Sequence, residues 1–117
     1  MMIAKELLKG SIKSIVLKIL TENERMYGYE LTRRVEELTS GTIKLTLGAL
    51  YPILHKLESD GDVTTESEVV NNRTRVYYKL TPGGLETAKV KIKELFDYIE
   101  TIRRILSSNG RPVLQTI

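Results

Sequence analysis

The chain has 117 residues, of which 41% are hydrophobic and 28% are charged, so it is long enough for one globular domain with a modest core. It contains no cysteine, which excludes a disulfide framework and a thiolate metal site and is consistent with a reducing cytoplasm. The formal net charge of +3 is spread along the chain without a strongly basic segment, so nucleic-acid binding has to be argued from the positions of the cations rather than from their total.

Two amphipathic helices are predicted at the start of the chain. Apolar residues recur at helical spacing from Leu8 to Leu20, which predicts a helix over 5–21 whose first turns are loosened by Gly10-Ser11. A second, shorter helix is predicted around 31–38 and should stop at the Ser-Gly pair that follows. Lysines interrupt the first apolar run, so we expect no signal peptide and no membrane span, and we place the protein in the cytoplasm.

A third helix is predicted to begin at Thr46, whose hydroxyl can accept a hydrogen bond from a free backbone N–H. It should end at Asp60-Gly61, where glycine can adopt the left-handed conformation. Pro52 lies in its second turn and is expected to cause a local bend rather than a stop. The apolar stripe consists of Leu50, Leu54 and Leu57.

Residues 62–80 change from helical to extended character. A short extended run near Val63 is followed by Asn71-Asn72, and asparagine tolerates the positive φ angles of hairpin turns. After this turn, apolar and polar residues alternate, which predicts a half-buried strand. The segment therefore predicts a β-hairpin with a core-facing side made of Val76, Tyr78 and Leu80.

The last predicted helix begins at Thr81-Pro82, a threonine suited to cap a helix and a proline at the first helical position. Apolar residues then follow at alternating spacings of three and four, the a/d pattern of a coiled-coil seam. The seam consists of Leu85, Ala88, Ile92, Leu95, Ile99, Ile102 and Leu106. We expect residues 107–117 to form a flexible tail.

The order of these elements predicts a mainly α-helical protein with a small β-hairpin. Three helices followed by a two-stranded ribbon form a winged helix-turn-helix, and here a long C-terminal dimerisation helix follows it. We expect a DNA-binding domain over 1–80, whose first helix also contributes to the dimer, and a dimerisation helix over 81–106.

Four stretches of the sequence resemble the PadR family of bacterial transcriptional regulators. They are LLKGSIKSIVLKIL (7–20), YGYEL (27–31), LGALYPILHKLESDGDV (47–63) and RVYYKLT (75–81). The resemblance implies a homodimer that binds a palindromic operator and represses transcription until a small molecule or another signal relieves it. Two departures concern detailed contacts: Ala49 stands where many members have threonine, and Thr74 separates two arginines that are closer together in many relatives.

The residues of the third helix that lie off its leucine stripe are candidates for DNA contact. Several are apolar without a core role, which suits thymine methyls and sugar edges, while Thr46 and His55 can hydrogen-bond bases or phosphates. The alternative is an ordinary core helix with a polar back, in which Tyr51 is partly buried. The candidates are Thr46, Leu47, Gly48, Tyr51, Pro52, His55 and Lys56.

The hairpin supplies a second group of candidates for DNA contact. Basic residues share a strand with an interleaved tyrosine, an arrangement that suits phosphate or minor-groove contacts, although a solvated hairpin tip is the alternative. These candidates are Asn72, Arg73, Arg75 and Lys79. Gly28 should leave the start of the second helix open to a phosphate, Tyr29 is a further donor to phosphate, and Tyr27 is expected to pack.

We expect the seam of the last helix to form a homodimer interface, because a small domain leaves little to cover it; packing within one subunit is the alternative. Phe96 and the first-helix residues Leu8 and Ile12 are expected to join this interface. Together with Leu95 and Ile99 these residues could enclose a pocket for a small hydrophobic or aromatic effector.

No group of residues points to catalysis. His55 is the only histidine and no cysteine is present, so we expect no enzyme, no metal site and no cofactor. Gly83-Gly84 lacks the flanking residues of a phosphate-binding loop. The competing interpretation is a winged-helix protein-interaction module without DNA binding, which the five basic and five acidic residues of 41–81 favour.

Overall fold

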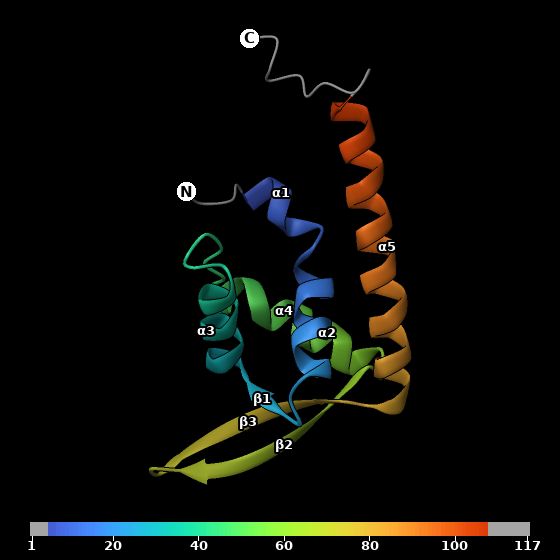
Figure 1. The fold of residues 1–117 in the computed structure, drawn as a ribbon. Coiled ribbons are helices and arrows are strands. Elements are labelled where there is room, and N and C mark those ends of the chain that lie inside the picture. Colours follow the sequence, from blue (N-terminus) through green and yellow to red (C-terminus); the bar gives the residue numbers. More distant parts are fainter. Residues whose placement is uncertain (1–4, 108–117) are drawn as a thin grey trace.

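The computed structural model describes residues 5–107 of the chain, and it confirms the predicted winged helix-turn-helix with a long final helix (Figure 1). The predicted tail lies outside the described residues apart from Ser107. The elements in chain order are α1 (Lys5–Lys9), α2 (Ile12–Thr21), β1 (Met26–Tyr27), α3 (Gly28–Leu38), α4 (Leu47–Ser59), β2 (Val63–Val70), β3 (Arg73–Leu80) and α5 (Pro82–Leu106).

The helix predicted over 5–21 is two helices, which corrects the sequence prediction. The chain turns at Gly10-Ser11, where both the backbone N–H and the hydroxyl of Ser11 donate to the carbonyl oxygen of Leu8, each at 2.9 Å. A serine that bonds back to the preceding turn competes with continued helix, and glycine before it lowers the cost of the break. Figure 1 shows α1 at an angle to α2.

The core lies where α2, α3 and α4 meet above the base of the sheet. Leu17, Leu31, Leu50 and Leu54 are each 0% exposed, so each of these helices places at least one leucine in the same interior. Burying a leucine stabilises a fold by about 1.5–3 kcal/mol. This core fixes α4 against α3 and leaves the opposite face of α4 in solvent.

Both ends of α4 form as the sequence predicts. The Oγ1 atom of Thr46 accepts a hydrogen bond from the backbone N–H of Ala49 at 3.2 Å, which caps the helix. Gly61 follows the last turn with a φ of 82°, in the left-handed region. The helix continues through Pro52, as predicted.

The sheet has three strands in the order β1-β3-β2, one strand more than the sequence predicts. The hairpin turn is at Asn71-Asn72, with φ angles of 51° and 62°, and all pairings are antiparallel. The additional strand β1 has only two residues, Met26 and Tyr27, which pair with Tyr78 and Tyr77. A strand this short carries no alternating pattern, so it could not be recognised before the structure was known.

The hairpin, which we call the wing (Val63–Leu80), is less buried than predicted. Of the expected core face, only Tyr78 is buried, at 4% exposure; Val76 is 37% exposed and Leu80 is half-buried. The reason is that the wing extends beyond the helices that cover its base, so its outer half has nothing to pack against (Figure 1). The exposed Val76 therefore faces a cleft rather than the core.

A tight joint sets the direction in which α5 leaves the sheet. The hydroxyl of Thr81 caps α5 by accepting from the backbone N–H of Gly84 at 2.9 Å, and the hydroxyl of Thr87 donates to the buried carboxylate of Asp62 at 2.7 Å. A Cβ at Gly84 would overlap the carbonyl oxygen of Asp62, so only glycine permits this approach. From the joint, α5 runs alongside α2 and then projects beyond it (Figure 1).

The seam predicted on α5 divides into two parts, which corrects the expectation of a purely intersubunit surface. Ala88 and Ile12 are 0% and 8% exposed, because α5 packs along α2 within the chain. Leu85, Ile99 and Leu106 remain 41%, 53% and 54% exposed. Phe96, also expected at the interface, is 67% exposed. The four other expected residues are partly buried, namely Leu8, Ile92, Leu95 and Ile102. Within residues 5–107 no helix is long and apolar enough to span a membrane.

Candidate nucleic-acid interface

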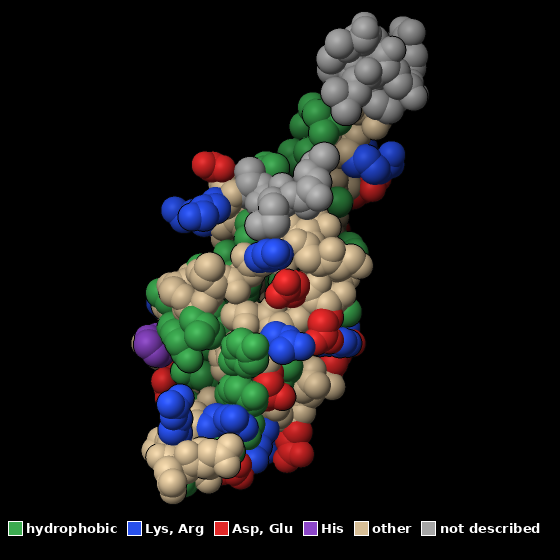
Figure 2. Space-filling model, turned by 90° about the vertical axis from the view of Figure 1, so that its left-hand side faces the viewer, with side chains coloured by type: hydrophobic (Ala, Val, Ile, Leu, Met, Phe, Trp, Pro, Cys, Tyr) green, Lys and Arg blue, Asp and Glu red, His purple; other side chains and the backbone are tan. Residues whose placement is uncertain are grey.

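A cleft of about 880 Å³ lies between the exposed face of α4, the start of α3 and the wing; we call it the α4–wing cleft. It brings together five of the candidate DNA contacts, which come from three separate elements. They are Tyr29, Tyr51, His55, Arg73 and Arg75. On the face shown in Figure 2, lysine or arginine side chains lie beside a group of hydrophobic side chains in the lower part of the molecule.

The other candidates on α4 lie on its exposed face, outside the lining of the cleft. Leu47 is 37% exposed, and Pro52 and Gly48 are exposed beside it. Thr46 is exposed as well, although its hydroxyl already serves as the helix cap. The ammonium group of Lys56 is 3.1 Å from the carboxylate of Asp60, so part of its charge is offset within the helix. This face carries apolar, hydroxyl and cationic groups, which are residue types that can contact thymine methyls, bases and phosphates.

The cations of the wing fall into two groups that differ in their partners. Arg73 is exposed next to Asn72 at the tip and takes part in none of the ion pairs described among residues 5–107. Arg75 lies with its guanidinium carbon 4.0 Å above the ring of Tyr27, and its Nη1 donates to the Tyr77 hydroxyl at 3.4 Å. That hydrogen bond raises the pKa of Arg75, so the group stays cationic.

Arg25, directly before β1, packs on the wing and was not singled out from the sequence. Arg25 lies 3.9 Å above the ring of Tyr77 and forms ion pairs with Glu68 at 2.7 Å and Glu66 at 2.9 Å. The hydrogen bond to Glu68 raises the pKa of Arg25 above its ordinary value. Lys79 shares Glu66 as a partner at 4.0 Å. No local signal could identify Arg25, because its partners lie more than 40 residues away along the chain.

The start of α3 lines the cleft beside the ring of Tyr51, and phosphate binding at Gly28 stays a prediction. Gly28 is buried beneath the ring of Tyr51, and the backbone N–H of Tyr27 donates to the Glu30 carboxylate at 3.2 Å. Tyr27 packs edge-on against Tyr77, with ring centroids 5.6 Å apart, as predicted for a packing tyrosine. The ring of Tyr29 is 52% exposed and remains accessible from the cleft.

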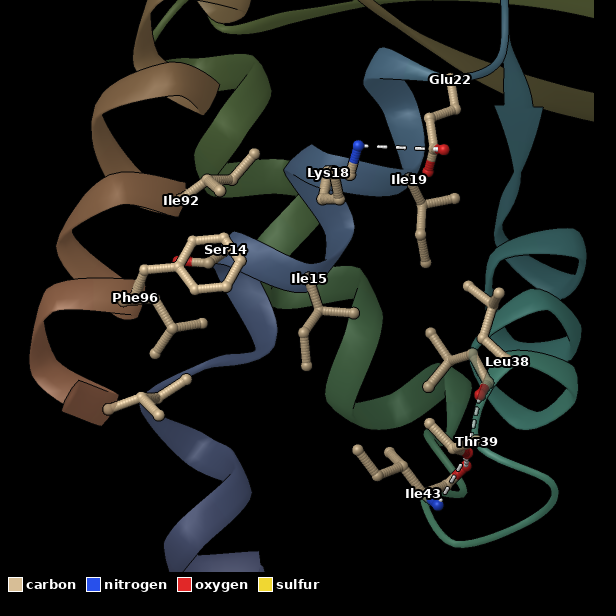
Figure 3. A pocket seen from close by; sticks show the side chains of 13 residues that line it. Ser14, Ile15, Lys18, Ile19, Glu22, Leu38, Thr39, Ile43, Ile92 and Phe96 are labelled. Carbon is tan, nitrogen blue, oxygen red and sulfur yellow. Dashed lines mark hydrogen bonds and ion pairs between the residues drawn. The ribbon is translucent and has the colours of Figure 1, made fainter. Parts of the chain in front are cut away.

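A second concave surface is lined by other residues and has a different character. This α5 groove has a volume of about 400 Å³ and is formed by α2, the end of α3 with its following loop, and α5 (Figure 3). Ile15 and Ile19 line it from α2, Leu38 from α3 and Phe96 from α5. Three residues of the pocket expected from sequence line it, Leu95, Phe96 and Ile99, whereas Leu8 and Ile12 do not.

The polar groups at the groove make contacts within the chain. The hydroxyl of Thr39 donates to the Val35 carbonyl at 2.8 Å and accepts from the Ile43 N–H at 3.0 Å. Lys18 and Glu22 pair at 3.8 Å on the rim (Figure 3). Among residues 5–107, no three histidine, aspartate or glutamate side chains are grouped so that they could hold a metal ion. The groove therefore offers an apolar surface rather than a polar site.

Comparison with protein families identifies the fold's relatives. The model of the transcriptional regulator PadR-like family matches residues 16–90. This range is more than half of the chain and runs from α2 into α5. The chain belongs to the PadR-like family of transcriptional regulators. The resemblance noted from the sequence is thereby confirmed, and PadR-like proteins are regulators rather than enzymes.

Individual relatives are consistent with this assignment. A transcriptional regulator of Mycobacterium tuberculosis is 35% identical over 80 residues, which cover 68% of this chain and 71% of that protein. The solved structure of a transcriptional regulator from Clostridium thermocellum has a TM-score of 0.78 at 25% identity, covering 86% of this chain and 97% of that one. A PadR family transcriptional regulator from Eggerthella lenta has a TM-score of 0.75 at 28% identity, covering 89% and 88%.

Proposed function

We propose that this PadR-like protein is a homodimeric repressor that binds a palindromic operator through α4 and the wing. The observation that carries the proposal is the α4–wing cleft, which places Tyr51 and His55 of α4 opposite Arg73 and Arg75 of the wing. In a winged helix, such an arrangement lets a helix contact base edges in the major groove while the wing contacts the adjacent backbone or minor groove.

The proposed roles follow from the chemistry of each group. Leu47, Tyr51 and Pro52 offer apolar surface to thymine methyls and sugars, whereas His55 can hydrogen-bond a base or phosphate. Arg73 at the tip contributes a cation without an ion-pair partner among the described residues, and the aromatic ring of Tyr27 holds the cation of Arg75. Lys56 and Lys79 already have acidic partners and contribute less. Thr46, Gly48, Asn72 and Tyr29 complete the proposed contact set.

The homodimer is supported by the apolar side chains that α5 leaves in solvent. Phe96 is 67% exposed, Ile99 53% and Ile105 63%, more than a helix facing water requires. At helical spacing, Phe96 and Ile99 share one face of α5 with Leu85 and Leu106, and a second copy of α5 would cover this face. Two copies related by a two-fold axis would present two α4 helices to the two halves of a palindrome.

A gel-shift experiment tests DNA binding. The DNA upstream of the protein's own gene is compared with unrelated DNA of equal length and base composition, at fixed salt concentration. We expect the upstream DNA to be bound about a thousandfold or more tightly than the unrelated DNA. Equal weak binding to both, or none, would contradict the proposal. Higher transcription from that promoter after deletion of the gene supports repression, and lower transcription would contradict it.

One observation favours the competing interpretation, a winged-helix module that binds another protein. Glu66 and Glu68 engage Arg25 and Lys79, so the base of the wing carries less available positive charge than its sequence suggests. If no DNA is bound in the gel shift and the protein is still folded and dimeric, this interpretation becomes the better one.

We further propose that a small hydrophobic or aromatic effector releases the protein from DNA by binding at the α5 groove. A volume of about 400 Å³ is the size of small-molecule pockets, and its lining is apolar with an aromatic ring from Phe96. Planar aromatic compounds are screened by thermal shift, with Leu38→Ala as the control, because Leu38 lines the groove from α3 and is not part of the proposed dimer surface. A raised unfolding temperature that is reduced in Leu38→Ala, together with release of DNA, is expected. A panel that stabilises neither protein contradicts the effector.

A further inference from the structure

Gly28 is the first residue of α3, and its backbone conformation does not require glycine. The glycines whose φ lies in the left-handed region among the described residues are Gly41 and Gly61, with φ angles of 80° and 82°. Gly28 instead begins an ordinary helix, where alanine is the more favourable residue. The reason for a glycine at this position must therefore lie in what surrounds it.

The space beside Gly28 is occupied by the ring of Tyr51 from α4. A Cβ placed at Gly28 would lie 3.0 Å from the Tyr51 hydroxyl oxygen and 3.2 Å from its Cε1 and Cζ atoms. Contacts this short require the neighbour to move. Gly83, which also lies in the first turn of a helix, differs: the nearest atom to its Cβ would be the Oγ1 of Thr81, at 3.8 Å. Of these two helix-start glycines, only Gly28 excludes a side chain to make room for another.

Tyr51 in turn lies against His55, one helical turn further along α4. The two rings are nearly parallel, with an interplanar angle of 21° and centroids 6.1 Å apart. Both line the α4–wing cleft and both are exposed there, Tyr51 at 39%. The imidazole therefore has the tyrosine ring on one side, and the tyrosine ring has the backbone of Gly28 beside it. If the Tyr51 ring shifts away from Gly28, the space available to the His55 imidazole changes.

We propose that Gly28 is a positioning residue for base recognition, which acts through the ring of Tyr51 on the orientation of His55. The inference rests on the proposed function, because it assigns Tyr51 and His55 to the surface that reads DNA. It links two helices of the helix-turn-helix: the start of α3 sets the side-chain geometry of α4. The bare backbone at position 28 thus helps determine which base pairs are preferred, without contacting a base itself.

The DNA experiment compares Gly28→Ala and Gly28→Val with wild type, and uses Gly83→Ala as the matched control. Affinity is measured by fluorescence anisotropy on the operator and on single-base-pair variants of it, over a salt series. We expect Gly28→Ala to weaken operator binding by about fivefold or more, as when one base contact is lost, and Gly28→Val to weaken it further. The order of preference among the operator variants should change, with the salt slope unaltered because phosphate contacts persist.

A double-mutant cycle separates positioning from general damage to the fold. In a Tyr51→Ala background the ring is absent, so Gly28→Ala should cause no further change in affinity or base preference. Thermal unfolding of every variant shows whether the fold is kept. If Gly28→Ala has the same effect with and without the Tyr51 ring, or no more effect than Gly83→Ala, the inference is wrong.

A measurement without DNA distinguishes failure of this inference from failure of the proposed function. The chain has a single histidine, so the tag-free protein gives one set of imidazole signals in a proton NMR spectrum. Gly28→Ala should shift these signals by moving the Tyr51 ring, and Gly83→Ala should not. Shifted signals in a protein that binds no DNA would refute the proposed function but support the coupling. Unshifted signals in a protein that binds its operator would refute the coupling alone.

Discussion

The α4–wing cleft and the α5 groove differ in chemistry, and that difference indicates what each one binds. The α4–wing cleft is lined by tyrosines, a histidine and arginines, whereas the α5 groove is lined mainly by aliphatic side chains and Phe96. Polar and cationic side chains can remain in water at little cost in free energy, and binding to an anionic partner is favourable for them. Exposed aliphatic groups gain only from apolar cover. One chain thus carries a surface suited to DNA and another suited to a second copy or an apolar ligand.

The charged residues of and around the wing also differ in their partners. Near the tip Arg73 is exposed, while farther from the tip Glu66 pairs with Arg25 and Lys79, and Glu68 pairs with Arg25. A segment with equal numbers of acidic and basic residues can therefore still have its charges unevenly distributed in space. The tip remains a cationic surface, and the base is held by contacts within the chain.

The largest expected effect is on the apolar surface. Replacing Leu95 and Ile99 together by aspartate should raise the dimer dissociation constant by about a hundredfold or more, since each buried aliphatic side chain contributes about 1.5–3 kcal/mol. Sedimentation velocity measures the change. The control is Glu94→Asp with Thr101→Asp, which places aspartate on polar positions of the same helix. If the double variant remains a folded dimer with the wild-type dissociation constant, this face of α5 does not form the dimer interface.

The next effect concerns the cationic tip of the wing. Arg73→Ala with Arg75→Ala should lower DNA affinity and reduce the salt slope of log K by about 0.9 for each lost phosphate contact. Anisotropy over a salt series measures both, and Lys89→Ala with Lys93→Ala is the control of equal charge change. Loss confined to operators with an A·T-rich flank would indicate minor-groove contact instead. Unchanged affinity and slope would show that the wing does not touch DNA.

A smaller effect of opposite sign is expected at the base of the wing. Glu66→Gln with Glu68→Gln removes the acidic partners of Arg25 and frees positive charge near the proposed DNA path. Binding to nonspecific DNA should become a few times tighter, about two- to fivefold, because exposed ion pairs are weak and the field of the wing changes modestly. Glu86→Gln on α5 is the control. Weaker binding would mean instead that the ion pairs hold the wing in its binding conformation.

The smallest effect lies near the end of α5. The hydrogen bond from Arg103 lowers the pKa of Glu100 below its ordinary value of 4.5, so this carboxylate contributes stability above that pH and loses it as the pH falls through the lowered value. Glu100→Gln should lower the melting temperature slightly at pH 7 and at pH 5. At more acidic pH the two melting curves should coincide. A difference that grows with acid would reverse the sign assigned to this pair.

Local features of the fold are predictable from sequence, and long-range ones are not. The cap at Thr46 and the turn at Asn71-Asn72 depend on neighbouring residues, and both form as expected. Strand β1 exists only because β3 pairs with it, and the contact between Gly28 and Tyr51 joins separate helices. A periodic seam shows which residues of α5 are apolar, but it does not show that Ala88 is covered by its own chain.

The candidate site shows the same limit. The residue types of α4 and of the wing tip were recognisable because each lies in a short segment with a known geometry. The depth of the cleft and the pairing of Arg25 with acids from β2 depend on how the wing folds back beside α3. The family resemblance already indicated that α4 and the wing act together in DNA binding. The structure adds which of their cations have ion-pair partners.

The most direct test of the account is the stoichiometry of the protein on its own operator. Sedimentation velocity of a labelled palindromic duplex, titrated with wild-type protein at fixed salt, gives the mass of the complex. We expect one discrete complex with two chains per duplex, and single-chain binding or none in Leu95→Asp with Ile99→Asp. A complex of one chain per duplex, or the same two-chain complex in that double variant, would contradict a dimer that presents two α4 helices to one palindrome.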